Sequence, residues 1–165
     1  MQRRQPPSST TLTLLEEVAR AVARHSVVIQ RPVEEVFAVL TNVELTGRWY
    51  PARVEEWWTS PAPPRIGSTR RARVRVMGLS VENDAVITAY DPPRLAAMKG
   101  TSRGAPFEVT LAFRPEGSGT RVDVDSALHF RGLLRLVGAV FVSSYERGWA
   151  RGLANLKRMM ESGQL

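Results

Sequence analysis

The C-terminal segment, residues 132–163, constrains the fold of this chain more than any other stretch. Apolar residues recur there at three- and four-residue steps, which is the spacing of one face of an α-helix. They are Leu133, Leu134, Val137, Phe141, Tyr145, Trp149, Leu153, Leu156 and Met160. The spacing predicts one helix from Leu133 to Glu161, roughly 44 Å long at about 1.5 Å per residue. Such a long apolar stripe needs a large apolar surface to cover it.

Two glycines lie in this predicted helix four residues apart, Gly148 and Gly152, and therefore share one face. A glycine in a helix interior costs about 1 kcal/mol relative to alanine. Either the two glycines allow close packing against a neighbouring element, or they leave space for a bound molecule. We favour close packing, and the second interpretation stays open.

The middle of the chain alternates with the period of two that is typical of strands. Between Ser68 and Val76 apolar residues alternate with arginines, and Arg70, Arg71, Arg73 and Arg75 are predicted to form a solvated outer face. The next strand is expected to direct its apolar side inward through Val81, Asn83, Ala85, Ile87 and Ala89. Turns rich in proline or glycine, such as residues 91–93 and 116–119, separate further strands. The pattern predicts about six consecutive antiparallel strands.

Another strand, over residues 25–30, is predicted ahead of these six. Pro32 follows it and suits the first position of a helix, and a second short helix or turn is expected over residues 43–49. Residues 12–22 are ambiguous, because Thr13 and Glu16 fit a helical capping box while the strand could begin as early as Ala21. Residues 1–20 are interpreted as a partly disordered extension, and residues 21–165 as one domain.

These elements predict an α+β fold. A curved antiparallel sheet of about seven strands surrounds the long C-terminal helix, with two short helices after the first strand. One face of such a sheet is apolar and needs a cover, and only the C-terminal helix is large enough to supply it. A strongly curved sheet does not close perfectly on a helix, so the space between them is a natural place for a cavity.

Composition excludes several kinds of site. The chain of 165 residues has no cysteine, and its two histidines, His25 and His129, lack carboxylates at ligand spacing, so we expect no metal and no cofactor. No apolar run is long enough to span a membrane, and no secretion signal is evident, so the cytoplasm is expected. The net charge is +7, from 21 arginines and two lysines against 16 acidic residues. This charge could attract nucleic acid, anionic lipid or acidic ligands, or simply reflect compositional bias.

Several segments together resemble the START-like (SRPBCC) superfamily of polyketide cyclases, dehydrases and lipid-transport proteins. VVIQRPVEEVFAVLTNVELTGRWYP resembles its opening, AVITAYDPPRLAAM its strand–Pro–Pro–Arg–Leu turn, and residues 119–122 and LANLKRMMES its last hairpin and helix. The resemblance covers roughly Ser26 to Ser162 and implies a helix-grip fold. It does not imply one function, because the superfamily includes lipid carriers, aromatic cyclases, co-chaperones and ribosome-associated proteins.

The candidate cavity residues are the inward aromatic and aliphatic side chains together with one carboxamide. Any of them could instead be ordinary core. Asn83 is the most informative, because a polar group on an apolar face must find a partner or a ligand. Tyr145 could orient a carbonyl or act as a weak acid; these two are the only catalytic candidates. The predicted ligand-binding set is Trp49, Trp57, Val74, Val76, Asn83, Ile87, Phe107, Val109, Leu111, Phe141, Tyr145 and Trp149, and whether Trp57 or Trp58 points inward is left open.

The sequence therefore favours binding of a small hydrophobic molecule, such as a lipid, polyketide or aromatic metabolite. A polyketide cyclase or dehydratase using the same cavity is the main alternative, so enzymatic activity stays undecided. A third interpretation is a docking module for a ribosome or protein, with an anionic partner on the Arg70–Arg75 face. Aromatic side chains are not interleaved with these arginines, so sequence-specific nucleic-acid binding is not expected. The chain could act as a monomer or a homodimer.

Overall fold

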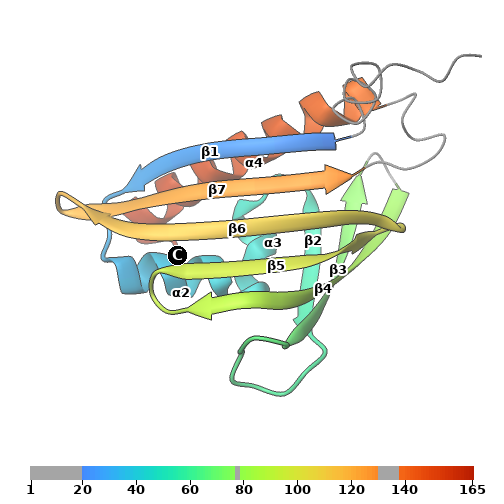
Figure 1. The fold of residues 1–165 in the computed structure, drawn as a ribbon. Coiled ribbons are helices and arrows are strands. Elements are labelled where there is room, and N and C mark those ends of the chain that lie inside the picture. The colour runs from blue at the N-terminus through green and yellow to red at the C-terminus, as the bar shows by residue number, and fades with distance from the viewer. Residues whose placement is uncertain (1–19, 77–78, 130–137) are drawn as a thin grey trace, which may run out of the picture.

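The computed structural model describes residues 20–76, 79–129 and 138–165 (Figure 1). Strand β1 (Arg20–Ile29) is followed by α2 (Val33–Thr41), the 3-10 turn η1 (Val43–Leu45) and α3 (Thr46–Trp49). Six strands come next, and α4 ends the chain. Their bounds are β2 (Arg53–Trp58), β3 (Thr69–Val76), β4 (Leu79–Asp91), β5 (Leu95–Ser102), β6 (Ala105–Glu116), β7 (Gly119–His129) and α4 (Gly138–Glu161).

The strands form one seven-stranded sheet in the order β1-β7-β6-β5-β4-β3-β2, and every neighbouring pair is antiparallel. Consecutive strands from β2 to β7 are therefore neighbours, and β1 joins the sheet at the β7 edge. Helices α2, α3 and α4 all lie on the same side of the curved sheet (Figure 1). The predicted α+β fold, with its curved sheet, long C-terminal helix and two short helices, is confirmed.

Helix α4 supplies the main cover of the sheet. Its buried residues Trp149, Leu153, Leu156 and Met160 belong to the core, as the helical spacing predicted. The helix packs mainly against β1, at the sheet edge. The predicted beginning of this helix at Leu133 lies outside the described residues, and so do Leu134 and Val137.

Helix α2 closes one end of the structure. It begins one residue after Pro32, which is the N-cap, and Glu34 and Glu35 occupy its first turn, where carboxylates interact favourably with the helix dipole. Its buried residues Val36, Phe37 and Leu40 pack into the core. The ring centre of Phe37 lies 5.1 Å from that of Phe113 on β6 and 5.6 Å from that of Tyr90 on β4.

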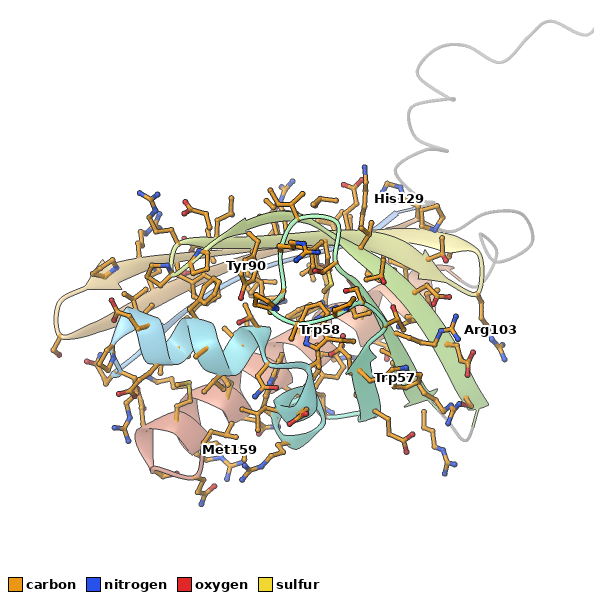
Figure 2. The ribbon with its side chains drawn as sticks, turned by 90° about the horizontal axis from the view of Figure 1, so that it is seen from below. Trp57, Trp58, Tyr90, Arg103, His129 and Met159 are labelled. Atoms are coloured by element: carbon orange, nitrogen blue, oxygen red, sulfur yellow. The ribbon has the colours of Figure 1, made fainter. Side chains whose placement is uncertain are left out.

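Two predictions about strands need adjustment. Residues 20–22 belong to β1, because they pair with β7 from Arg20 opposite His129 onward; the capping box at Thr13 and Glu16 lies outside the described residues. In β4 the pairing with β5 shifts between Ile87 and Ala89. This bulge reverses the alternation beyond it, so Tyr90, and not Ala89 as predicted, packs against the core (Figure 2).

Candidate functional site

A cavity of about 700 Å³ lies between the inner face of the sheet, α3 and α4. Its lining is mainly apolar and includes most of the side chains that the sequence pattern selected. These are Trp49, Val74, Asn83, Ile87, Phe107, Val109, Leu111, Tyr145 and Trp149. The side chains of two other predicted residues, Val76 and Phe141, lie outside the described part of the structure.

The remaining predicted residue, Trp57, does not line the cavity. Its side chain is on the outer face of β2, 37% exposed, and the Arg73 guanidinium lies 6.0 Å from its ring centre. Its neighbour Trp58 lines the cavity instead (Figure 2). Successive side chains of a strand point to opposite faces, so the sequence shows that one tryptophan enters the cavity but the strand register decides which.

Small residues on β3 and β4 make room for the cavity, and a glycine on β5 lets that strand approach β4 closely. Ala72 and Ala85 lie on the lining of β3 and β4, and Gly100 pairs with Ala85 across β4 and β5. A Cβ at Gly100 would lie 1.9 Å from the carbonyl oxygen of Asp84, so only glycine allows the two strands to approach this closely. The inner face of the sheet therefore stays open where larger side chains would otherwise fill it.

An ion pair lies on the lining of this mainly apolar cavity. Arg70 on β3 and Glu56 on β2 both line it, with side chains 13% and 7% exposed, and Arg70 Nε is 3.0 Å from Glu56 Oε1. The Arg70 side chain also reaches Met98 on β5. The residue opposite Arg70 on β4 is Ala85, whose side chain is small. Burial lowers the pKa of the Arg70 guanidinium, and Glu56 partly offsets that effect.

The prediction that Arg70 belongs to the outer arginine face is therefore wrong. Arg70 precedes Arg71 directly, and adjacent residues of a strand cannot share a face. Arg71 and Arg73 do lie outside, where Arg71 Nε is 2.8 Å from Asp84 Oδ1 and Arg73 Nη2 is 3.1 Å from Glu82 Oε1. These cross-strand ion pairs offset much of the positive charge that the sequence pattern suggested for this face.

Asn83 lies on the cavity lining, as predicted. Its Oδ1 atom is buried and has no hydrogen-bond partner among the described residues. Across the sheet Asn83 is opposite Ala72 on β3 and Ser102 on β5, and Ala72 is in turn opposite Glu56. Glu56, Ala72, Asn83 and Ser102 therefore form one row across four strands, with three polar side chains in it.

A further polar side chain, that of Tyr145, lies on the α4 side of the cavity. The Tyr145 hydroxyl is hydrogen-bonded to the hydroxyl of Ser126 on β7. Burial raises the pKa of the Tyr145 phenol, although its hydrogen bonds act in the opposite direction. Burial also raises the pKa of Tyr50 to about 12, with a smaller contribution from nearby Tyr145. Both phenols therefore stay neutral near pH 7, able to donate a hydrogen bond.

The geometry is consistent with a family relationship across almost the whole domain. Residues 20–161 match the family described as polyketide cyclase / dehydrase and lipid transport. The chain belongs to this family. No curated protein matches the sequence.

Solved structures share the fold at low sequence identity. TTHA0849 from Thermus thermophilus is 18% identical with a TM-score of 0.70, over 87% of this chain and 99% of that one. The Aha1 protein of Colwellia psychrerythraea, solved as a dimer, is 17% identical with a TM-score of 0.61, over 87% and 98%. DynU16, from the dynemicin biosynthetic locus, is 19% identical with a TM-score of 0.63; the match covers 87% of this chain but 48% of DynU16.

In this member of the polyketide cyclase, dehydrase and lipid transport family, aromatic rings pack against the α4 glycines. A Cβ at Gly152 would lie 3.1 Å from Tyr50 Cδ2 and 3.2 Å from Trp49 Cζ3, and one at Gly148 would lie 2.9 Å from the Tyr50 hydroxyl. Trp49, Tyr50 and Trp149 form a cluster with ring centres 5.8–6.5 Å apart. The favoured interpretation, close packing against a neighbouring element, is confirmed for Gly152. Gly148 packs against the Tyr50 hydroxyl and also lines the cavity, so both interpretations apply there. Tyr50 also lines the cavity, and periodicity could not find it because it follows a one-turn helix.

Neither a metal site nor a membrane-spanning helix is found in the part of the chain that the structure describes. It contains no cluster of three or more histidine, cysteine, aspartate or glutamate side chains able to hold a metal ion. Among the same residues, no helix is long and apolar enough to cross a membrane.

Proposed function

We propose that the cavity binds one small, mostly apolar organic molecule. The observation that carries this proposal is a mainly apolar cavity of about 700 Å³, on whose lining a carboxamide oxygen, Asn83 Oδ1, has no hydrogen-bond partner among the described residues. Ligand pockets of about 300–1,000 Å³ are typically apolar with a few polar groups that fix orientation. Membership of a family of polyketide cyclases, dehydrases and lipid-transport proteins supports the same function.

The energetics of Asn83 support binding over plain core packing. Asn83 Oδ1 is buried and no described residue donates a hydrogen bond to it, so a ligand hydroxyl or N–H supplies a bond that plain core packing does not. The apolar part of the same ligand covers Leu111, Phe107 and Trp149, and burial of apolar surface favours binding.

Native mass spectrometry of the protein after incubation with a lipid extract tests this function. Ala85→Phe should fill the cavity, because Ala85 lies on its lining and is 9% exposed. Thr110→Phe adds the same ring on the exposed outer side of β6 and is the matched control. We expect a bound small molecule with the unmodified chain and with Thr110→Phe, and none with Ala85→Phe. Retention of nothing by the unmodified chain, or equal retention by all three, contradicts the proposal.

A cyclase or dehydratase function is the second candidate, and a specific observation favours it. The same cavity contains the Glu56 carboxylate and the Tyr145 phenol, groups that can serve as base and as hydrogen-bond donor to a carbonyl. Conversion of a retained compound, lost in Tyr145→Phe or Asn83→Ala at unchanged stability, would support this function. Recovery of the compound unaltered favours binding alone.

The docking-module hypothesis has less support. Arg71 and Arg73 are paired with carboxylates, and surface pairs of this kind leave little net charge for an anionic partner. Whether the chain is a monomer or a homodimer stays a prediction, for which size-exclusion chromatography with light scattering is the direct test.

A further inference from the structure

The cavity contains one positively and one negatively charged side chain that are both buried. This pair affects which ligands, charged or uncharged, the cavity can bind. Arg70 supplies a buried guanidinium and Glu56 a buried carboxylate 3.0 Å away. The pair is neutral as a whole, and both side chains are largely shielded from bulk water. A charged ligand group placed beside it would attract one partner and repel the other.

Asn83 adds the hydrogen-bonding element. It is a diagonal neighbour of Arg70, because Arg70 pairs with Ala85 two residues further along β4. No residue in the described part of the chain donates a hydrogen bond to its Oδ1 atom, which can only accept one, so the complementary ligand group is a hydroxyl or an N–H. The Arg70 Nε atom also has no hydrogen bond of good geometry within the described chain, despite its contact with Glu56, and could donate one to the ligand hydroxyl oxygen.

From this arrangement we propose that the site selects an uncharged ligand with a hydroxyl group, and that Glu56 enforces this selection by neutralising Arg70. The inference rests on the proposed function and adds the substrate class. With Glu56 absent, the buried Arg70 would be an unpaired cation, which is strongly unfavourable in an apolar environment. An anionic ligand would then be its natural partner. Glu56 is therefore a specificity residue that acts through Arg70.

Other charges border the cavity but do not change this expectation. Arg75, Arg147 and Arg151 are on its lining and are exposed, so solvent screens them. They can attract an anionic group to the cavity, in the unmodified protein and in each variant alike. Their contribution to the binding of a charged ligand is the same in every variant that keeps them. A difference between variants therefore reports on Glu56 and Arg70.

Fluorescence titration with three pyrene probes at pH 7 tests the proposal. Pyrene-1-methanol is neutral, pyrene-1-carboxylate is an anion and pyrene-1-methylammonium is a cation, and all three share one ring system. The unmodified protein should bind the alcohol about tenfold more tightly than either ion, the effect expected from one unfavourable charge contact. In Glu56→Gln the preference for alcohol over carboxylate should shrink by about tenfold or reverse.

The matched control is Glu55→Gln, because Glu55 is adjacent on β2 but lies outside, 3.7 Å from Arg73. It removes the same charge and should leave the preference unchanged. If Glu56→Gln does not fold, the double variant Glu56→Gln/Arg70→Gln replaces it. Its uncharged pair should retain the preference for the alcohol.

Three results would overturn the inference. One is carboxylate binding by the unmodified protein that equals or exceeds alcohol binding. Another is an equal change of preference in Glu55→Gln and Glu56→Gln, and a third is preference for the anion in the double variant. Failure of all three probes to bind the unmodified protein would instead contradict the proposed function itself, and the inference would fall with it.

Discussion

At the scale of single residues, burial decides how each polar side chain in the cavity behaves. Glu56 and Arg70 are both largely shielded from water, whereas the outer pairs of Arg71 and Arg73 are about half exposed. Exposed pairs contribute about 0–1 kcal/mol, but breaking a buried pair leaves a charge without a partner. Arginines on the same strand therefore differ greatly in the expected effect of their substitution.

This contrast predicts the outcome of a double-mutant cycle. Arg70→Met alone should destabilise the protein by about 3–5 kcal/mol, because Glu56 is left buried and unpaired. Arg70→Met combined with Glu56→Leu should recover most of that loss, since the pair is replaced by apolar side chains. Urea denaturation measures both. A double variant as unstable as Arg70→Met would mean that the pair is not buried as described.

Tyr50 gives a pH-dependent prediction. Its folded-state pKa is about 12, above the ordinary value of about 10, so the neutral phenol stabilises the fold below pH 10. Between pH 10 and 12 the unfolded chain loses this proton before the folded one does. The unmodified protein should lose about 2–3 kcal/mol over this range beyond whatever Tyr50→Phe loses. Parallel stability curves for the two proteins would show that Tyr50 is not buried.

At the scale of elements, periodicity predicted nearly all of the fold. The alternation of β3 to β7 and the stripe of α4 are strong because each element buries one face only. The errors have physical causes. The outward placement of Arg70 is wrong because adjacent residues of a strand point to opposite faces. The inward placement of Ala89 is wrong because a bulge without a sequence signature reverses the alternation. The choice between Trp57 and Trp58 depends on how β2 pairs with β3, and the sequence of β2 alone does not determine that pairing. Tyr50 reaches the cavity through tertiary packing alone.

The packing of α4 against α3 predicts the effect of a small substitution. Gly152→Ala should favour the helix by about 1 kcal/mol in isolation, yet its Cβ would press on the rings of Tyr50 and Trp49. Overpacking of this kind typically costs about 1–3 kcal/mol, so we expect a net loss of stability. The exposed Ala150→Gly on the same helix is the control and should cost about 1 kcal/mol. A gain of stability in Gly152→Ala would contradict the close packing.

The contact of α4 with the sheet makes a second prediction for this element. Leu153 is 3% exposed within the core, so Leu153→Ala should cost about 2–5 kcal/mol. Thermal or urea unfolding measures the loss. A cost below about 0.5 kcal/mol, the usual range of surface substitutions, would mean that the sheet does not hold the helix there.

At the scale of the whole molecule, the cavity follows from a mismatch of shapes. Seven strands curve over α4, but α4 packs mainly on β1 at one edge. On the opposite part of the inner face, β2 to β5 line the cavity with small residues, a few polar side chains and larger apolar ones such as Trp58 and Met98. The sequence predicted a cavity of this kind and nine of the residues that line it, but not the Glu56–Arg70 pair, because side chains from two strands meet there.

The central claim is that a ligand enters the space beneath the sheet, and the four tryptophans of the chain provide a direct test. The side chains of Trp49, Trp58 and Trp149 line the cavity, whereas Trp57 lies on the outer face. In a ¹H–¹⁵N spectrum titrated with pyrene-1-methanol, the indole N–H signals of the three inner tryptophans should shift and that of Trp57 should stay in place. A shift confined to Trp57, or equal shifts of all four, would contradict the account.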